Sequence, residues 1–318
     1  MSASASPDLV LLLDRRVAAL RARRADLGEA LDLQDLLVRT SLSSPRAPRA
    51  EPFPLPREQV AGRARQGVPL LHDQPLSLDV HFAADLFSRL VDALLDRGGT
   101  DLNLRLEPIV AAATDGALDP EHLFEEAFVQ HADHLEQIAA QAGLDVELLV
   151  TLASRAVAPL LQVYAQHLVQ MLDRLDDGTS QGAAWHMGYC PICGGWPLLG
   201  ELRGVELALW LRCWACGSGW RGQRLVCAFC SNNDYRTLGS LAIEGEQRFR
   251  ISVCERCKGY LKVGNAFEPT PAALLALDDV ASLHLDLVAL ERGYQRPAGS
   301  GYRIELATPE AEWLEELA

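Results

Sequence analysis

Every cysteine of this 318-residue chain belongs to a Cys-x-x-Cys pair, a spacing that delivers two sulfur ligands from one tight turn. The four pairs are Cys190/Cys193, Cys213/Cys216, Cys227/Cys230 and Cys254/Cys257. In a reducing compartment such pairs indicate metal binding or catalysis more often than structural disulfides. Four thiolates form the tetrahedral site that suits zinc, and equally a single iron ion. The eight cysteines therefore predict two metal ions per chain, iron or zinc.

The segments between the pairs indicate which pairs share an ion. Residues 196–212 and 231–253 each divide at a glycine, Gly204 and Gly245, into two apolar-rich halves, as β-hairpins do. A hairpin returns the chain to its starting point and so brings its flanking pairs side by side, whereas residues 217–226 are too short for one. We predict one site from Cys190, Cys193, Cys213 and Cys216, and a second from Cys227, Cys230, Cys254 and Cys257. A nested pairing, first with fourth and second with third, stays open.

Two histidine groups could also contribute ligands. His131 and His134 lie one helical turn apart, but no carboxylate accompanies them at the spacing of a di-iron bundle. We interpret them as solvated or half-buried side chains. His186 could cap or replace a ligand of the first site, although four thiolates already complete it.

Charged and aromatic residues around the cysteines have structural and functional interpretations. Lys258 and Lys262 could moderate the charge of a metal site, but the favoured interpretation is solvated lysines around a packed Tyr260. Asp278 and Asp279 precede helical spacing and are expected to be N-caps. Five tryptophans suit either a small core or a partner contact: Trp185, Trp196, Trp210, Trp214 and Trp220.

Apolar residues recur at helical spacing through residues 7–176 and again through 271–293, and a last acidic helix is expected at 309–317. Pro159 predicts a kink or a break, and residues 176–184 are interpreted as a linker. The expected fold class is α+β and multidomain, with an N-terminal helical bundle, two rubredoxin-like or zinc-ribbon β modules and C-terminal helices. The expected units are a helical domain (1–183), a first four-cysteine module (184–222), a second four-cysteine module (223–268) and a C-terminal helical segment (269–318) that packs on the others.

Composition and motifs also limit the classes of function that the sequence allows. Hydrophobic residues make up 49% and charged residues 23%, as in a globular protein. No uninterrupted apolar run approaches the roughly 20 residues that cross a bilayer, and no export signal is recognisable, so we expect a cytoplasmic protein without membrane insertion. A formal net charge of −14 disfavours nucleic acid as a partner. No phosphate loop, nucleophile–base pair or paired carboxylates indicate an enzyme, so we expect no catalytic residues and no organic cofactor.

The motifs CPICG, CWACGSGW, RLVCAFC and CERCKGYLK, followed by the helix DDVASLHLDLVALERGY, resemble the formate dehydrogenase accessory proteins of the FdhE family. The specific part of this resemblance covers residues 188–294. It implies a cytoplasmic protein required for active respiratory formate dehydrogenase, which acts on the molybdenum- or tungsten-containing catalytic subunit before export. It also implies two rubredoxin-like modules, with iron as a candidate metal. An alternative is a rubredoxin-like electron-transfer or thiol-redox protein that acts through the same four-cysteine sites.

Overall fold

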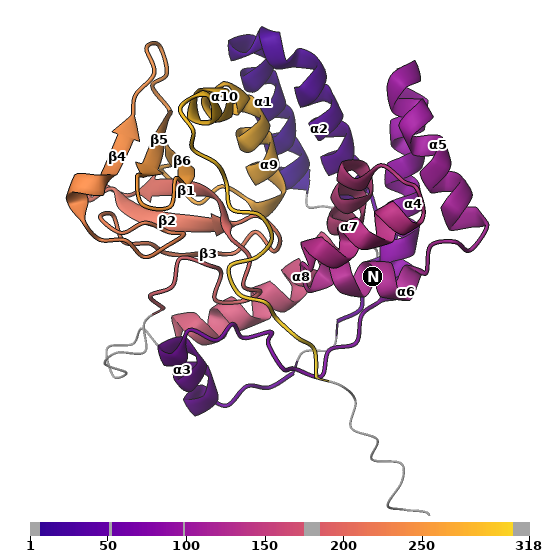
Figure 1. Ribbon diagram of the computed structural model, residues 1–318, viewed down its shortest axis with the longest axis horizontal. Helices are drawn as coiled ribbons and strands as arrows, with labels where there is room; N and C mark the ends of the chain where they lie inside the picture. The colour runs from indigo at the N-terminus through magenta and orange to yellow at the C-terminus, as the bar shows by residue number, and fades with distance from the viewer. Residues whose placement is uncertain (1–6, 51–52, 98, 175–184, 308–318) are drawn as a thin grey trace, which may run out of the picture.

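In this computed structural model the described residues are 7–50, 53–97, 99–174 and 185–307. The N-terminal part is helical and the cysteine-bearing part forms a sheet beside it (Figure 1). The N-terminal helices are α1 (Pro7–Arg23), α2 (Gly28–Leu42), α3 (Arg57–Gln66), α4 (Val80–Arg97), α5 (Thr100–Thr114), α6 (Pro120–Phe128), α7 (Ala132–Gln141) and α8 (Val146–Asp173). The linker expected at 176–184 and the helix expected at 309–317 lie outside the described residues.

Helix α8 is the centre of the helical part. Its first turn is capped by Asp145, whose carboxylate accepts a hydrogen bond from the Leu148 N–H. The helix continues through Pro159, so the break expected there is absent. By length and composition α8 would suit a membrane-spanning helix. Its apolar face, however, packs against α4, α6 and α7, which is what the core helix of a bundle requires.

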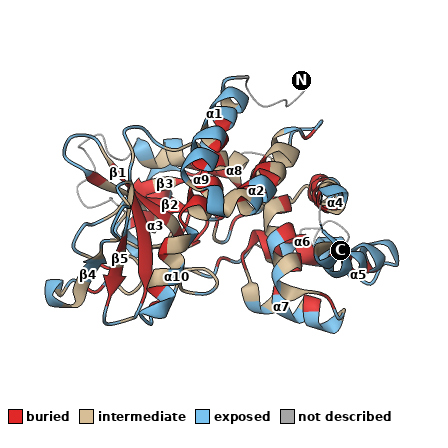
Figure 2. Ribbon diagram, turned by 90° about the horizontal axis from the view of Figure 1, so that it is seen from above, coloured by how far each residue is buried: buried red, intermediate tan, exposed pale blue. Residues whose placement is uncertain are grey.

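The cysteine-bearing region folds into one six-stranded sheet rather than two separate β modules. Its strands are β1 (Pro197–Arg203), β2 (Ala208–Cys213), β3 (Gly219–Arg221), β4 (Leu238–Leu241), β5 (Phe249–Cys254) and β6 (Tyr260–Asn265). The order is β3-β2-β1-β6-β5-β4, and the β1–β6 pair in its middle is parallel while the other pairs are antiparallel. Buried residues gather in this sheet and on the inner faces of the helices (Figure 2).

Both expected hairpins are present. Strand β1 pairs with β2 across Gly204, and β4 pairs with β5 across Gly245; these glycines have φ of 69° and 85°, a region that glycine enters without strain. The expected fold class is confirmed: a helical N-terminal region, cysteine-bearing β structure and C-terminal helices. The parallel β1–β6 pair joins strands from both sides of the boundary expected at 222/223, and the domain boundaries stay a prediction.

The helix expected over 271–293 is divided into α9 (Ala272–Ala281) and α10 (Leu283–Glu291). The division falls at Ser282, whose hydroxyl donates to the carbonyls of Asp278 and Asp279 and ends α9. Helix α9 contacts α1, α2 and β1, whereas α10 contacts β5, so the two helices connect the bundle to the sheet (Figure 1).

The interpretation of Asp278 and Asp279 as N-caps is wrong, because α9 begins at Ala272 and both residues lie in its last turns. Asp278 is 2% exposed and accepts from Arg16 of α1 at 2.6 Å and from Arg248 at 2.7 Å. Asp279 is held by Lys262 of β6 and by Arg296. The buried Asp278 and the half-buried Asp279 therefore serve as ion-pair partners between separate elements.

The expected packing of Tyr260 is confirmed, since this side chain is 3% exposed and its hydroxyl donates to Asp286. The expected solvation of the two lysines holds for Lys258, which is exposed and pairs with Glu255. It is wrong for Lys262, which is fully buried. Its ammonium lies 2.8 Å from Asp279 Oδ1 and 2.6 Å from Asp286 Oδ2. The Asp286 contact fastens α10 to β6.

Replacement of Lys262 by Met should destabilise the protein by about 3 kcal/mol, because it leaves two buried carboxylates to share Arg296. Urea unfolding followed by circular dichroism measures the loss. The matched control is Lys258→Met, which removes the only other lysine of the chain from an exposed position and should change the unfolding midpoint little. Equal effects of the two substitutions would show that the buried lysine does not hold α10 to the sheet.

Candidate metal centre

The four Cys-x-x-Cys turns share one backbone geometry. In each turn the N–H of the first cysteine donates to the carbonyl five residues later, at 2.8 to 3.0 Å. The residue after the second cysteine has positive φ in every turn: Gly194 (74°), Gly217 (71°), Ser231 (55°) and Lys258 (57°). In the sequence, Gly194 and Gly217 indicated a positive φ in the first two turns. Ser231 and Lys258 seldom adopt positive φ, so only the structure reveals this conformation in the other two turns.

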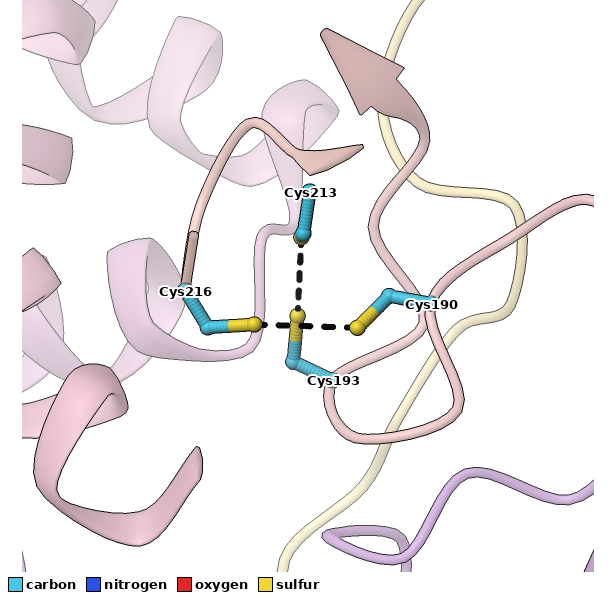
Figure 3. Close-up of side chains that lie close together, drawn as sticks. All are labelled: Cys190, Cys193, Cys213 and Cys216. Carbon is cyan, nitrogen blue, oxygen red and sulfur yellow. Dashed lines mark hydrogen bonds between the residues drawn. The ribbon is translucent and has the colours of Figure 1, made fainter. Parts of the chain in front are cut away.

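The turns assemble the sulfurs in the two sets that the hairpins predict, and not in the nested pairing. Cys190 and Cys216 approach to 3.6 Å between sulfurs, and Cys193 and Cys213 to 3.5 Å, along two crossed directions (Figure 3). In the second set the Cys227–Cys257 and Cys230–Cys254 distances are 3.7 and 3.8 Å. A tetrahedral ion with sulfurs at about 2.3 Å requires sulfur–sulfur edges of about 3.8 Å, and a disulfide about 2.05 Å. Each set could therefore hold one metal ion.

The first set is fully enclosed, and its protonation depends on that enclosure. Burial raises the pKa of the Cys190 and Cys213 thiols, and most of the hydrogen bonds among the sulfurs act with it. Against burial, donors from the other sulfurs and from Ser218 lower the pKa of Cys216. These contacts favour the thiol at Cys190 and Cys213 and the thiolate at Cys216, and four thiolates in this space require a cation among them.

The second set is partly open to solvent at Cys230 and Cys257. Burial raises the pKa of Cys257 to about 11. At Cys254 burial is outweighed by backbone N–H donors and by the Asn232 side chain, which lower the pKa to about 7. This set is therefore the more accessible of the two, and one of its sulfurs ionises near neutral pH.

The first set is anchored to the helical part. The N–H groups of Leu70 and Leu71 donate to the carbonyls of Pro191 and Ile192 at 2.8 and 3.0 Å. The buried side chain of Gln130 donates to the Cys193 carbonyl at 2.9 Å. The first metal turn is thus fixed by residues before α4 and after α6, and no sequence pattern pairs those residues with it.

The two sets are close neighbours. A Cβ on Gly188 would lie 1.6 Å from the Ala228 carbonyl oxygen, so only glycine fits where the segment before the first turn crosses the third. Trp196 and Phe229 meet edge to face with ring centroids 5.5 Å apart. Among the five tryptophans, Trp220 is buried core, while Trp214, inside the second turn, is 37% exposed. The tryptophans therefore divide between core and accessible surface.

A third cluster contains the two histidines of the sequence analysis. His131 is half-buried as expected, but a carboxylate does accompany the pair: Glu126 Oε2 lies 2.8 and 2.9 Å from the Nδ1 atoms of His131 and His134. The Nε2 atoms face Arg303, whose Nε donates to His131 at 3.1 Å. Because a guanidinium already occupies this side, the cluster is an anchor for the C-terminal segment. His186 is exposed and belongs to neither sulfur set.

Comparison with known proteins supports the expected family. The model of the FdhE C-terminal domain matches residues 225–301, which include the second sulfur set with α9 and α10. A Protein FdhE homolog of Rhizobium meliloti is 27% identical over 60% of this chain and 69% of its own length. A Protein FdhE homolog of Pseudomonas aeruginosa is 36% identical over 34% of this chain, and this alignment covers 37% of that protein.

The crystal structure of the FdhE protein from Pseudomonas aeruginosa is similar over nearly the whole chain. It covers 93% of this chain and 96% of its own, with a TM-score of 0.56 and 25% identity. The structural match therefore includes the first sulfur set and the helical part, which the C-terminal family model does not cover. The resemblance identified in the sequence is confirmed.

The grouping of the sulfurs generates a prediction for metal content. Cys213→Ser should release one metal ion per chain and leave the second, because only one set loses a ligand. Cys230→Ser is the matched substitution in the other set and should likewise leave one ion. Elemental analysis of the purified variants measures both. A variant that loses both ions, or a double variant that retains one, would contradict two independent sites.

Proposed function

This chain is a relative of the FdhE proteins, and on that basis we propose that it is a formate dehydrogenase accessory protein. In this proposal it acts in the cytoplasm in the maturation of respiratory formate dehydrogenase and binds the catalytic subunit before export. The observation that carries the proposal is the pair of four-sulfur clusters within an FdhE-like fold. The protein supplies a binding surface and no catalytic residues.

We further propose that all eight cysteines are metal ligands and that each cluster holds one iron or zinc ion. The sulfur spacing suits either ion. Zinc would fix the turns without redox chemistry, whereas iron would also allow one-electron transfer. In both cases the fully buried first set would brace the sheet against the helical part, and the second would lie nearer to partners.

The outer face of α10 is our candidate for the client contact. Leu283, Leu287 and Leu290 lie on one side of this helix and are 37%, 63% and 54% exposed. The opposite side of α10 packs on the sheet through Leu285 and Ala289, and Asp286 on the flank of the helix pairs with Lys262 of β6. Adjacent exposed leucines on a helix of fixed position are typical of a protein-binding surface. This face, close to the second sulfur set, supports a protein partner.

The second candidate function, electron transfer or thiol-redox exchange, is favoured by one observation. Cys230 and Cys257 are partly exposed, and the Trp196–Phe229 contact lies between the two sets. A client could therefore exchange electrons at the second set if the ions are iron.

The client contact can be tested by co-purification with the formate dehydrogenase catalytic subunit. Leu287→Asp should weaken binding by about tenfold or more, since a charge would be buried in an apolar interface. Val205→Asp is the matched control, because Val205 is 98% exposed in the β1–β2 turn and far from α10 in sequence. Metal content should be unchanged in both variants. Equal recovery of the client with both would exclude the α10 face, and a deletion strain with fully active respiratory enzyme would refute the accessory role.

The two functions differ in the state of the metal. We expect two metal ions per chain, and an absorption spectrum combined with elemental analysis identifies them. Zinc-loaded protein should be colourless and unaffected by dithionite, which would remove the electron-transfer function. Iron-loaded protein should be coloured in the oxidised state and bleach on reduction, which would retain it.

A further inference from the structure

A cavity of about 400 Å³ lies where the helical part meets the second Cys-x-x-Cys turn. Its wall comes from α2, α8, α9 and residues 213–217, and most of it is apolar. The charged side chains among its lining residues are Arg155 and Asp279. It shares Trp214 and Leu198 with a neighbouring cavity of about 290 Å³. Of the two sulfur sets only Cys213 lines this space, and no residue of α10 does.

The guanidinium of Arg155 has little to balance its charge. Within the described residues its Nη2 donates to Gln34 Oε1 at 3.0 Å, and no carboxylate there accepts from it. Burial lowers the pKa of Arg155, and the charge of Asp279 offsets this only in part, which reflects the cost of removing a cation from water. Arg155 is half-buried, and a guanidinium in this situation normally has a bidentate anionic partner.

Gln34, the neighbour of Arg155, has a donor without an acceptor. The side chain is 7% exposed, and because its oxygen accepts from Arg155, its amide nitrogen points elsewhere. That nitrogen is buried and has no hydrogen-bond partner among the described residues. One buried donor in the cavity wall, next to the Arg155 guanidinium, thus lacks an acceptor, and an unmade hydrogen bond of this kind is costly.

Asp279 does not supply the missing anion. Its Oδ1 lies 2.6 Å from Arg296 Nη2 and 2.8 Å from Lys262 Nζ. Asp286 contacts the same two cations, so this four-residue cluster is electrically neutral. Among the described residues Arg155 therefore has no carboxylate of its own, and it lies beside a neutral ion-pair cluster.

We propose that this cavity binds a carboxylate attached to an apolar group. The carboxylate would accept from Arg155 and from the Gln34 amide nitrogen, and the apolar group would pack against Leu198, Trp214 and Val280. A monoanion suits a single unmatched cation, whereas a phosphate dianion would bring excess negative charge next to Asp279 and the Cys213 sulfur. The carboxylate could come from a free small acid or from the C-terminus of a polypeptide. This inference does not depend on the proposed accessory function.

Isothermal titration of the full-length, metal-loaded protein tests the proposal. Hexanoate should bind at millimolar concentration or below, and hexanamide and inorganic phosphate should bind at least about tenfold more weakly, because hexanamide lacks the charge that strengthens the hydrogen bonds and phosphate carries excess charge. A short peptide that ends in leucine, with a free or an amidated C-terminus, distinguishes the source. Preference for the free peptide over hexanoate would indicate a polypeptide terminus, and the reverse a small acid; each supports the carboxylate site.

The variants identify the site. Arg155→Gln should weaken hexanoate binding at least about tenfold, while Arg105→Gln, an exposed arginine on α5, should bind as the wild type does. Gln34→Leu should also weaken binding and decides the matter if Arg155→Gln fails to fold. The proposal is overturned if hexanoate does not bind the wild type at millimolar concentration, if hexanamide or phosphate binds equally well, or if hexanoate affinity is unchanged in the folded variants.

Discussion

A Cys-x-x-Cys turn presents only two of the four sulfur ligands that a tetrahedral site requires. The need for two more ligands determines the path of the C-terminal half. Each turn must meet another turn, so the chain between them has to reverse. The β1–β2 and β4–β5 hairpins provide the reversals. They also place β1 and β6 side by side as the parallel pair that merges the two halves into one sheet. The pairing within each hairpin and the sulfur spacing are therefore consequences of one requirement, and the β1–β6 pair is a further contact between the hairpins.

The two sulfur sets are equivalent in local geometry but not in position. The first is enclosed between the sheet and the helical part, where backbone hydrogen bonds from Leu70 and Leu71 fix its turn. The second lies on the outer side, with two sulfurs partly open to solvent. Of two sulfur sets with the same local geometry, one is thus enclosed and the other accessible. That asymmetry is what an accessory protein with one structural brace and one client-facing region would need.

Ion pairs of low exposure connect the helices and strands that the sulfur sets do not join. Glu201 in the sheet accepts from Arg212 at 2.9 Å; burial would raise the pKa of this carboxyl, but Arg212 and Arg203 keep it below its usual value. Asp278 joins α1 to α9, and Lys262 joins β6 to α9 and α10. Such pairs are sensitive to the loss of one partner, so they specify how helices and sheet fit together more than they add net stability. Arg155 is the exception in this arrangement, because no carboxylate in the described part of the chain accepts a hydrogen bond from it.

Local patterns in the sequence determined the helical N-terminal half, the two hairpins, the eight sulfurs and their grouping, because each depends on periodicity or on short spacing. They also carried the family resemblance. Tertiary structure alone decided the merging of both hairpins into one sheet, the burial of Lys262 and the ion-pair role of Asp278. It also decided the meeting of Glu126 with His131 and His134, and the cavity around Arg155. The physical reason is the same throughout: these contacts join residues from separate elements, and a charged residue in a sequence does not reveal whether folding will bring it a partner.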